Sequence, residues 1–143
     1  MTIRTTINDK EIKELFRVLD TNIRQMRPAL RKIGGMLERA SEVAFNRQGP
    51  GWKPLSAKYK AQKIKEFGAG KKILERDGTL AGSISSRIIG DDTVAVGSNL
   101  IYARPHQLGS PKQGIPKREF LKVGPAETKK AIFIMSKHLV KGT

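Results

Sequence analysis

The side chains best suited to chemistry in this sequence are His106 and the charged residues that follow it, Lys117, Arg118 and Glu119. Together they offer an acid–base group and phosphate-binding groups, as a basic ribonuclease that pairs His106 with an Arg or Lys would need. A metal-dependent nuclease also needs several converging carboxylates, whereas the 13 acids here are scattered along the chain. The set by itself therefore gives weak support to a nuclease.

Other reactive combinations are sparse. Glu11 with Glu14 and Asp91 with Asp92 are acid pairs, but their positions are typical of a solvated helix face and of a turn. The sequence has no cysteine, which excludes disulfides, thiolate metal sites and cysteine nucleophiles, and its two histidines are too few for a His-rich site. The glycines follow neither the phosphate-loop nor the dinucleotide-binding pattern. We expect no enzymatic activity, no metal and no cofactor.

A large positive charge is the main feature of the composition. The 143 residues include 28 Lys and Arg against 13 Asp and Glu, a formal charge of +15, which predicts attraction to a polyanion or an acidic partner. The densest basic segment, 52–76, contains Lys53, Lys58, Lys60, Lys63, Lys65, Lys71, Lys72 and Arg76. These cations either neutralise phosphates or form a solvated outward face. No signature of a sequence-reading domain occurs, so any DNA contact is expected to involve the backbone.

The elements that must position these groups fit one domain spanning 1–143. Residues 2–7 alternate as a short strand, and Asn8 and Asp9 offer caps to a helix with an apolar stripe. That stripe comprises Ile12, Leu15, Phe16 and Leu19. A second helix is expected to restart at Thr21 and Asn22 and to end before 48–51. Its packing seam comprises Met26, Leu30, Ile33, Leu37, Ala40 and Ala44, and Gly34 and Gly35 mark either a close contact or a bend.

The second half alternates short elements with turns. Ser56 caps a short helix through Lys65, 79–83 form one helical turn, and 84–89 and 93–97 form a β-hairpin. A flexible basic loop is predicted at 110–119. Pro125 begins a last helix, whose apolar side is expected to contain Ile132, Phe133, Ser136, Leu139 and Val140. The predicted fold is α+β, with long N-terminal amphipathic helices and a C-terminal helix packed on a small antiparallel sheet.

Four segments occur in an order that is found in one known family. They are Gln-Gly-Pro-Gly-Trp-Lys-Pro-Leu-Ser at 48–56, the segment 73–84, the segments 96–99 and 102–109, and Ile-Pro-Lys-Arg-Glu-Phe-Leu at 115–121. Together they resemble the virion morphogenesis (tail completion) proteins of Mu-like and P2-like tailed phages. The resemblance spans roughly residues 1 to 141.

This resemblance implies a structural protein of the head–tail junction, or neck, or of the tail end, which is needed for tail completion and for head–tail joining. It implies no catalysis. The expected partners are tail terminator, tail tube or head connector subunits, and double-stranded DNA through its phosphates. Because phage tails commonly have six-fold symmetry, a homo-oligomeric ring of six around the DNA path is expected. The protein would reside in the virion and, during assembly, in the host cytoplasm.

The family motifs also imply roles for single residues. Trp52, Pro54 and Leu55 would anchor the loop after the long helix, and Tyr102, His106 and Gln107 would form a polar cluster near Gly109. Phe120 and Leu121 would dock the basic loop on the core, and Lys112, Lys117 and Arg118 would contact DNA or an acidic subunit. For His106 a structural hydrogen bond is favoured over metal ligation.

Two alternatives stay open at this point. One is a free-standing, sequence-independent nucleic-acid-binding accessory protein, and the other is the basic ribonuclease considered first. The sequence begins without the apolar block of a signal peptide and has no apolar run of membrane-spanning length. A soluble protein without membrane contact is therefore expected.

Overall fold

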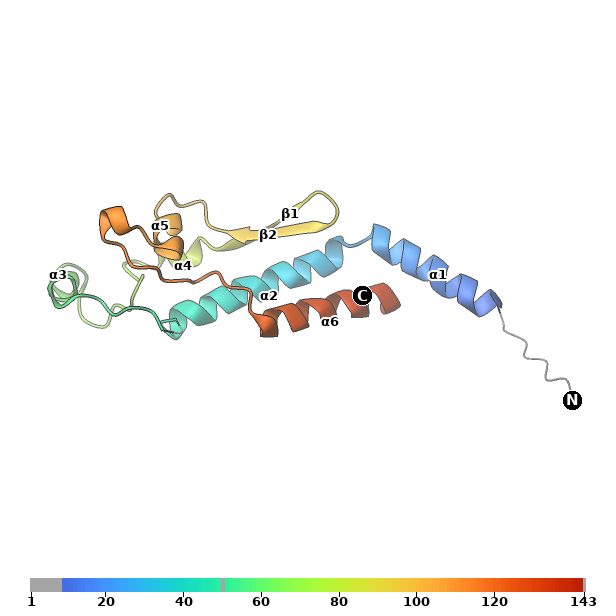
Figure 1. Ribbon diagram of the computed structural model, residues 1–143, viewed down its shortest axis with the longest axis horizontal. Helices are drawn as coiled ribbons and strands as arrows, with labels where there is room; N and C mark the ends of the chain where they lie inside the picture. The colour runs from blue at the N-terminus through green and yellow to red at the C-terminus, as the bar shows by residue number, and fades with distance from the viewer. Residues whose placement is uncertain (1–8, 50, 143) are drawn as a thin grey trace, which may run out of the picture.

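The computed structural model describes residues 9–49 and 51–142, so the strand predicted at 2–7 lies outside the described residues. In chain order the elements are α1 (Asp9–Arg24), α2 (Arg27–Asn46), α3 (Ala57–Phe67), α4 (Thr79–Gly82), β1 (Ser85–Ile89), β2 (Thr93–Gly97), α5 (Ala103–Leu108), the 3-10 turn η1 (Pro111–Gln113) and α6 (Pro125–Lys141). Helix α2 runs through the middle, with the hairpin on one side and α6 on the other, while α1 and α3 lie at opposite ends (Figure 1). The predicted α+β fold is confirmed.

The break between the first two helices falls at Gln25 and Met26, so the restart predicted at Thr21 and Asn22 is wrong. Pro28 explains the position. Proline has no N–H to donate to the carbonyl four residues earlier, and its ring clashes with that carbonyl, which here belongs to Arg24, the last residue of α1. The same proline is tolerated in the first turn of α2, where the backbone N–H groups have no partner within the helix.

Helix α2 covers the hairpin, as its predicted seam requires. A core cluster forms around the buried residues Met26, Ala29 and Leu30. Half-buried apolar residues of the hairpin and of α6 pack against it, namely Ile88, Val94, Ile134, Met135 and Leu139. The strands pair antiparallel, with Ile88 opposite Val94. The Glu38 carboxylate on α2 also accepts a hydrogen bond from the backbone N–H of Ser86. One face of the hairpin is therefore held by both apolar and polar contacts with α2.

Gly34 is the point of closest approach between α2 and the hairpin, which resolves the choice between close packing and a bend. A Cβ added at Gly34 would lie 2.6 Å from Ser86 Oγ and 2.7 Å from Ser86 Cβ, whereas one at Gly35 would meet nothing within 4 Å. Overpacking costs about 1–3 kcal/mol, more than the gain of about 1 kcal/mol that alanine brings to a helix.

We therefore expect opposite results at two adjacent glycines. Gly34→Ala should lower the free energy of unfolding by about 1 kcal/mol or more, and Gly35→Ala should raise it by about 1 kcal/mol. Urea unfolding followed by circular dichroism measures both. Equal effects at the two positions would show that α2 does not touch the hairpin at Gly34.

Helix α6 begins at Pro125 as predicted, but the apolar side predicted for it is exposed except at Leu139. Ile132, Phe133 and Val140 are exposed, whereas His138 is buried and Leu139 packs against α2. A polar residue occupies the centre of the packed side, because the Nε2 atom of His138 lies 2.8 Å from the carbonyl oxygen of Gln25. In the same junction the Asn22 side-chain amide donates to the carbonyl of Leu139 at 2.9 Å. These bonds hold the last turn of α1 against the end of α6.

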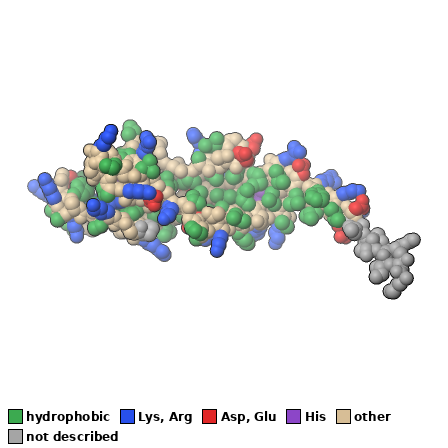
Figure 2. All heavy atoms as spheres, in the orientation of Figure 1, with side chains coloured by type: hydrophobic (Ala, Val, Ile, Leu, Met, Phe, Trp, Pro, Cys, Tyr) green, Lys and Arg blue, Asp and Glu red, His purple; other side chains and the backbone are tan. Residues whose placement is uncertain are grey.

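The apolar stripe of α1 lies on a helix as predicted, but of its four residues the rest of the described chain half-buries only Leu19 and leaves the other three exposed. Ile12 and Leu15 are exposed, and Phe16 is 65% exposed. Figure 2 shows hydrophobic side chains gathered over α6 and its junction with α1, with Lys and Arg side chains concentrated toward the α3 and α5 end. The stripe is therefore available to a partner.

Candidate functional site

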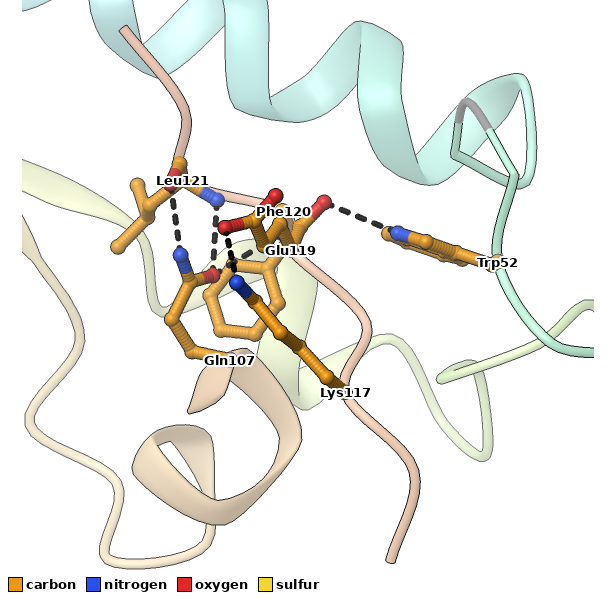
Figure 3. A network of polar contacts seen from close by, with 6 residues as sticks. All are labelled: Trp52, Gln107, Lys117, Glu119, Phe120 and Leu121. Carbon is orange, nitrogen blue, oxygen red and sulfur yellow. Dashed lines mark hydrogen bonds and ion pairs between the residues drawn. The ribbon is translucent and has the colours of Figure 1, made fainter. Parts of the chain in front are cut away.

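The segment 117–121, which contains the predicted motif residues Phe120 and Leu121, is held by the side-chain amide of Gln107 on α5. The Gln107 oxygen accepts hydrogen bonds from the backbone N–H groups of Phe120 and Leu121, both at 3.0 Å. The Gln107 nitrogen donates to the carbonyl of Leu121 at 2.7 Å. Figure 3 shows the amide facing this backbone from one side. One side chain thus satisfies three backbone groups of an irregular segment.

Trp52 holds the same segment from the opposite direction (Figure 3). Its indole N–H donates to the carbonyl of Glu119 at 2.9 Å, and its ring packs edge-on against Phe45 with 5.9 Å between centroids. Phe45 in turn lies 5.1 Å from the ring of Phe120, which is 1% exposed. With Leu80 and Ala103 these rings form the second core cluster. This arrangement agrees with the anchoring role expected for Trp52.

Other motif residues support the anchored segment less directly. Leu55 is half-buried, Pro54 and Tyr102 are exposed, and Leu121 packs against the core cluster. Gly109 has φ of 80°, and a Cβ there would lie 3.1 Å from the backbone nitrogen of Lys117. A side chain at Gly109 would therefore press on the start of the anchored segment.

The basic loop makes specific contacts with the rest of the chain. Ser110 and Ile115 exchange two backbone hydrogen bonds around η1, and the Arg118 N–H donates to the carbonyl of His106 at 2.8 Å. Lys117 forms an ion pair of 2.7 Å with Glu119. The flexibility expected for 110–119 stays a prediction. These hydrogen bonds attach the loop to the rest of the chain at defined points.

Arg118 and Lys63 differ from the other predicted contact residues because both are buried. The Arg118 Nε and Nη2 atoms donate to the carbonyl of Lys53 at 3.1 and 2.9 Å, and the Lys63 ammonium donates to the carbonyl of Lys72. Burial lowers the pKa of both side chains, and the charge of Arg118 lowers that of Lys63 further. Their burial is at odds with a role in contacting a DNA backbone at the surface.

The remaining predicted contact residues point to solvent: Lys58, Lys60, Lys65, Lys71, Lys72, Lys112 and Lys117. Contact of these side chains with DNA or with an acidic subunit stays a prediction. Lys72 also donates to the carbonyl of Asn46 and Lys117 pairs with Glu119, but all seven side chains are exposed and accessible to a partner.

A groove of about 1180 Å³ separates α3 from α5 and the basic loop. Tyr59, Lys63 and Phe67 of α3 line it on one side, and Tyr102 and His106 lie on the other. Residues 53, 54, 56, 74–77, 79, 80, 108, 109, 111 and 113–118 complete the lining, which includes Arg118. The sequence did not predict this groove, because Arg118 reaches the carbonyl of a residue 65 positions away.

His106 lies in the wall of the groove without the structural hydrogen bond expected of its ring. Its Nδ1 atom is buried and has no hydrogen-bond partner among the residues that the structure describes. Burial, followed by the nearby charge of Arg118, lowers the pKa of the imidazole. Within 9–49 and 51–142, no three His, Asp or Glu side chains gather in a way that would hold a metal ion. Among the described residues, no Asp or Glu bonds to Nδ1 as a carboxylate does when it orients a catalytic histidine.

Residues 7–140 match the phage virion morphogenesis family. The chain belongs to that family. The match includes the groove, the Gln107 contacts, all of α1 and all of α6 except Lys141. The resemblance inferred from the four segments is confirmed. Membership of the virion morphogenesis family indicates a role in assembling phage particles.

An uncharacterized protein of Methanocaldococcus jannaschii is 36% identical over 80 residues, which are 54% of this chain and 58% of that protein. The chain thus spans less than two thirds of the length of this curated relative. No solved structure is significantly similar to the chain. In the part of the virion morphogenesis protein that the structure describes, every helix is too short or too polar to span a membrane.

Proposed function

We propose that this protein is a structural subunit of the head–tail junction or of the tail end, needed for tail completion and head–tail joining. It acts as a homo-oligomeric ring around the DNA path, without catalysis, and contacts tail terminator, tail tube or head connector subunits. Family membership supports a virion-associated assembly role. The exposed apolar stripe of α1 carries the oligomeric part of the proposal.

Helix α1 leaves apolar side chains exposed that a neighbouring subunit could bury. Its first three turns carry Ile12, Leu15 and Phe16, all exposed, at a spacing that places them on one side of the helix. A helix with a sustained apolar side gains stability mainly by burying that side against a partner. In a ring, each copy presents the same arm and the same acceptor surface to its neighbours, so the contact is repeated until the ring closes.

The distribution of charge supports a position around DNA. A ring of six would carry about +90, and cations that contact only phosphates allow DNA to move because they impose no sequence register. The exposed lysines of α3 and of the basic loop are the candidates for this surface.

The predicted ring contact is tested by Phe16→Asp, which places a charge in the α1 stripe. We expect at least about tenfold fewer copies in purified particles, and unjoined heads and tails in the lysate, because a buried charge without a partner is strongly unfavourable. Quantitative mass spectrometry and electron microscopy of particles from a complemented deletion measure both. Since Phe16 is exposed, the fold of the free chain should be unchanged.

Thr21→Asp is the matched control, because it adds the same charge at an exposed position of α1 outside the stripe. It should assemble like the wild type. Normal incorporation of Phe16→Asp would contradict the ring contact, and normal particles from the deletion would contradict the assembly role. Tight duplex binding by a chain that is absent from particles would favour the nucleic-acid-binding accessory protein instead.

A further inference from the structure

The groove between α3 and the basic loop contains two buried cations that lack an acidic partner. Arg118 and Lys63 are each only 6% exposed, and both line the groove. Among residues 9–49 and 51–142, neither forms an ion pair with a carboxylate. Glu75 raises the pKa of Lys63 from nearby without pairing with it, and burial has the larger, opposite effect. Buried charges are normally paired, so this pair of cations is an exception that needs a reason.

Both side chains keep hydrogen-bonding capacity for a ligand. An Arg side chain has five N–H donors, and Arg118 uses its Nε and Nη2 atoms on one acceptor, the Lys53 carbonyl. Its Nη1 group has no partner among the described residues. Lys63 has three N–H donors and directs one at the Lys72 carbonyl. These bonds to backbone carbonyls fix the two cations in place while leaving donors for an anion.

Apart from Glu75 and Asp77, the lining of the groove combines cations with apolar groups, a combination that favours an anion attached to apolar groups. Tyr59 and Tyr102 stand on opposite sides, and Leu108, Ile115 and Pro116 continue the apolar lining. Arginine binds a carboxylate through two parallel hydrogen bonds, with a geometry that a planar carboxylate matches. Side chains of an extended peptide alternate in direction, so one carboxylate can point inward while its apolar neighbours lie along the walls.

We propose that this groove is a docking site for an extended acidic segment of a partner protein, with one carboxylate bound by Arg118 and Lys63 and flanking apolar side chains packed on the tyrosines. DNA is disfavoured because phosphates of a duplex lie on a broad convex surface, whereas the two cations are recessed in the groove. The surface lysines suit phosphates better. The proposal stands on the geometry of the groove and not on the place of the protein in the particle. In a virion, the segment would belong to a neighbouring subunit.

The test uses the full-length protein and a random 12-residue peptide library displayed on an unrelated filamentous phage. We expect the selected peptides to share an Asp or Glu next to apolar residues. Synthetic copies, measured by fluorescence anisotropy, should bind at least about tenfold more weakly when that acid is replaced by its amide, and when Arg118→Gln or Lys63→Gln removes a cation.

Leu108→Glu keeps the test valid if the buried substitutions disturb folding. Leu108 is 58% exposed on the groove, and Ile132 is 59% exposed on α6 outside it, so Leu108→Glu and Ile132→Glu add the same charge at equal exposure. Only Leu108→Glu should abolish binding. Failure to select acidic peptides, or equal binding by the two variants, would overturn the proposal. Loss of duplex DNA binding in Leu108→Glu but not in Ile132→Glu would overturn it in favour of a nucleic-acid groove. None of these outcomes depends on particle assembly.

Discussion

Phe120→Ala is expected to lower the free energy of unfolding by about 3–5 kcal/mol, the range found when a buried aromatic ring is removed. Phe120 is 1% exposed and lies 5.1 Å from the ring of Phe45. Its ring packs with the end of α2, with the Trp52 loop and with α5, so its removal affects three elements at once. Since small domains are stable by about 5–15 kcal/mol, this one substitution removes a large share of the total. Urea unfolding followed by circular dichroism measures the loss.

Phe133→Ala is the matched control, because the same atoms are removed from a side chain that is 68% exposed on α6. Its effect should stay within about 0.5 kcal/mol. If Phe120→Ala does not fold at all, Phe120→Leu, which leaves a smaller cavity, should fold and lose about 1–2 kcal/mol. A loss below 1 kcal/mol in Phe120→Ala would show that the second core cluster is not a structural unit.

Most elements could be predicted because their signals are local. Ser56 caps α3 by accepting a hydrogen bond from the backbone N–H of Tyr59, Pro125 begins α6, and three turn-forming residues separate β1 from β2. Each signal lies within a few residues of the boundary that it sets. Pro28 was a local signal too, but Thr21 and Asn22, which can cap a helix, placed the expected boundary too early.

Faces of helices were harder to predict than the helices themselves. The packed side of α6 contains His138. Because histidine is polar, the hydrophobicity pattern of the helix predicts that the opposite side is buried. The burial of His138 becomes understandable only with the carbonyls at the end of α1, more than 110 positions away. The stripe of α1 has the pattern of a packed helix, yet within the described chain its Ile12, Leu15 and Phe16 stay exposed.

The sequence indicated which residues form the candidate site, but it did not indicate the groove or the burial of its cations. Trp52, Gln107 and Phe120 stand in segments that resemble the family, and the structure brings them together around 117–121. The burial of Arg118 and Lys63 had no sequence signal, because lysine and arginine in a basic chain ordinarily remain in solvent. Their backbone acceptors could not be inferred without the fold.

Gln107→Ala should have the second large effect, a loss of about 2–4 kcal/mol. Its side-chain oxygen serves two backbone donors and its nitrogen serves one acceptor. Removal of the amide leaves buried backbone groups of Phe120 and Leu121 without a partner, at a cost of about 1–3 kcal/mol each. Water that enters the site would recover part of that cost, so the total stays below the sum. Urea unfolding again provides the measurement.

Gln62→Ala is the corresponding control, since the Gln62 amide bonds only to the Glu66 carboxylate on the exposed surface of α3. We expect a change within about 0.5 kcal/mol there. Because the segment held by Gln107 also contains Arg118, Gln107→Ala should weaken peptide binding in the groove even at temperatures where the chain is folded, and Gln62→Ala should not. Unchanged stability in Gln107→Ala would mean that the other contacts of 117–121, made by Trp52, Phe120 and Arg118, suffice to position the segment. A loss of stability with unchanged peptide affinity would separate the anchoring of the segment from the docking of a partner.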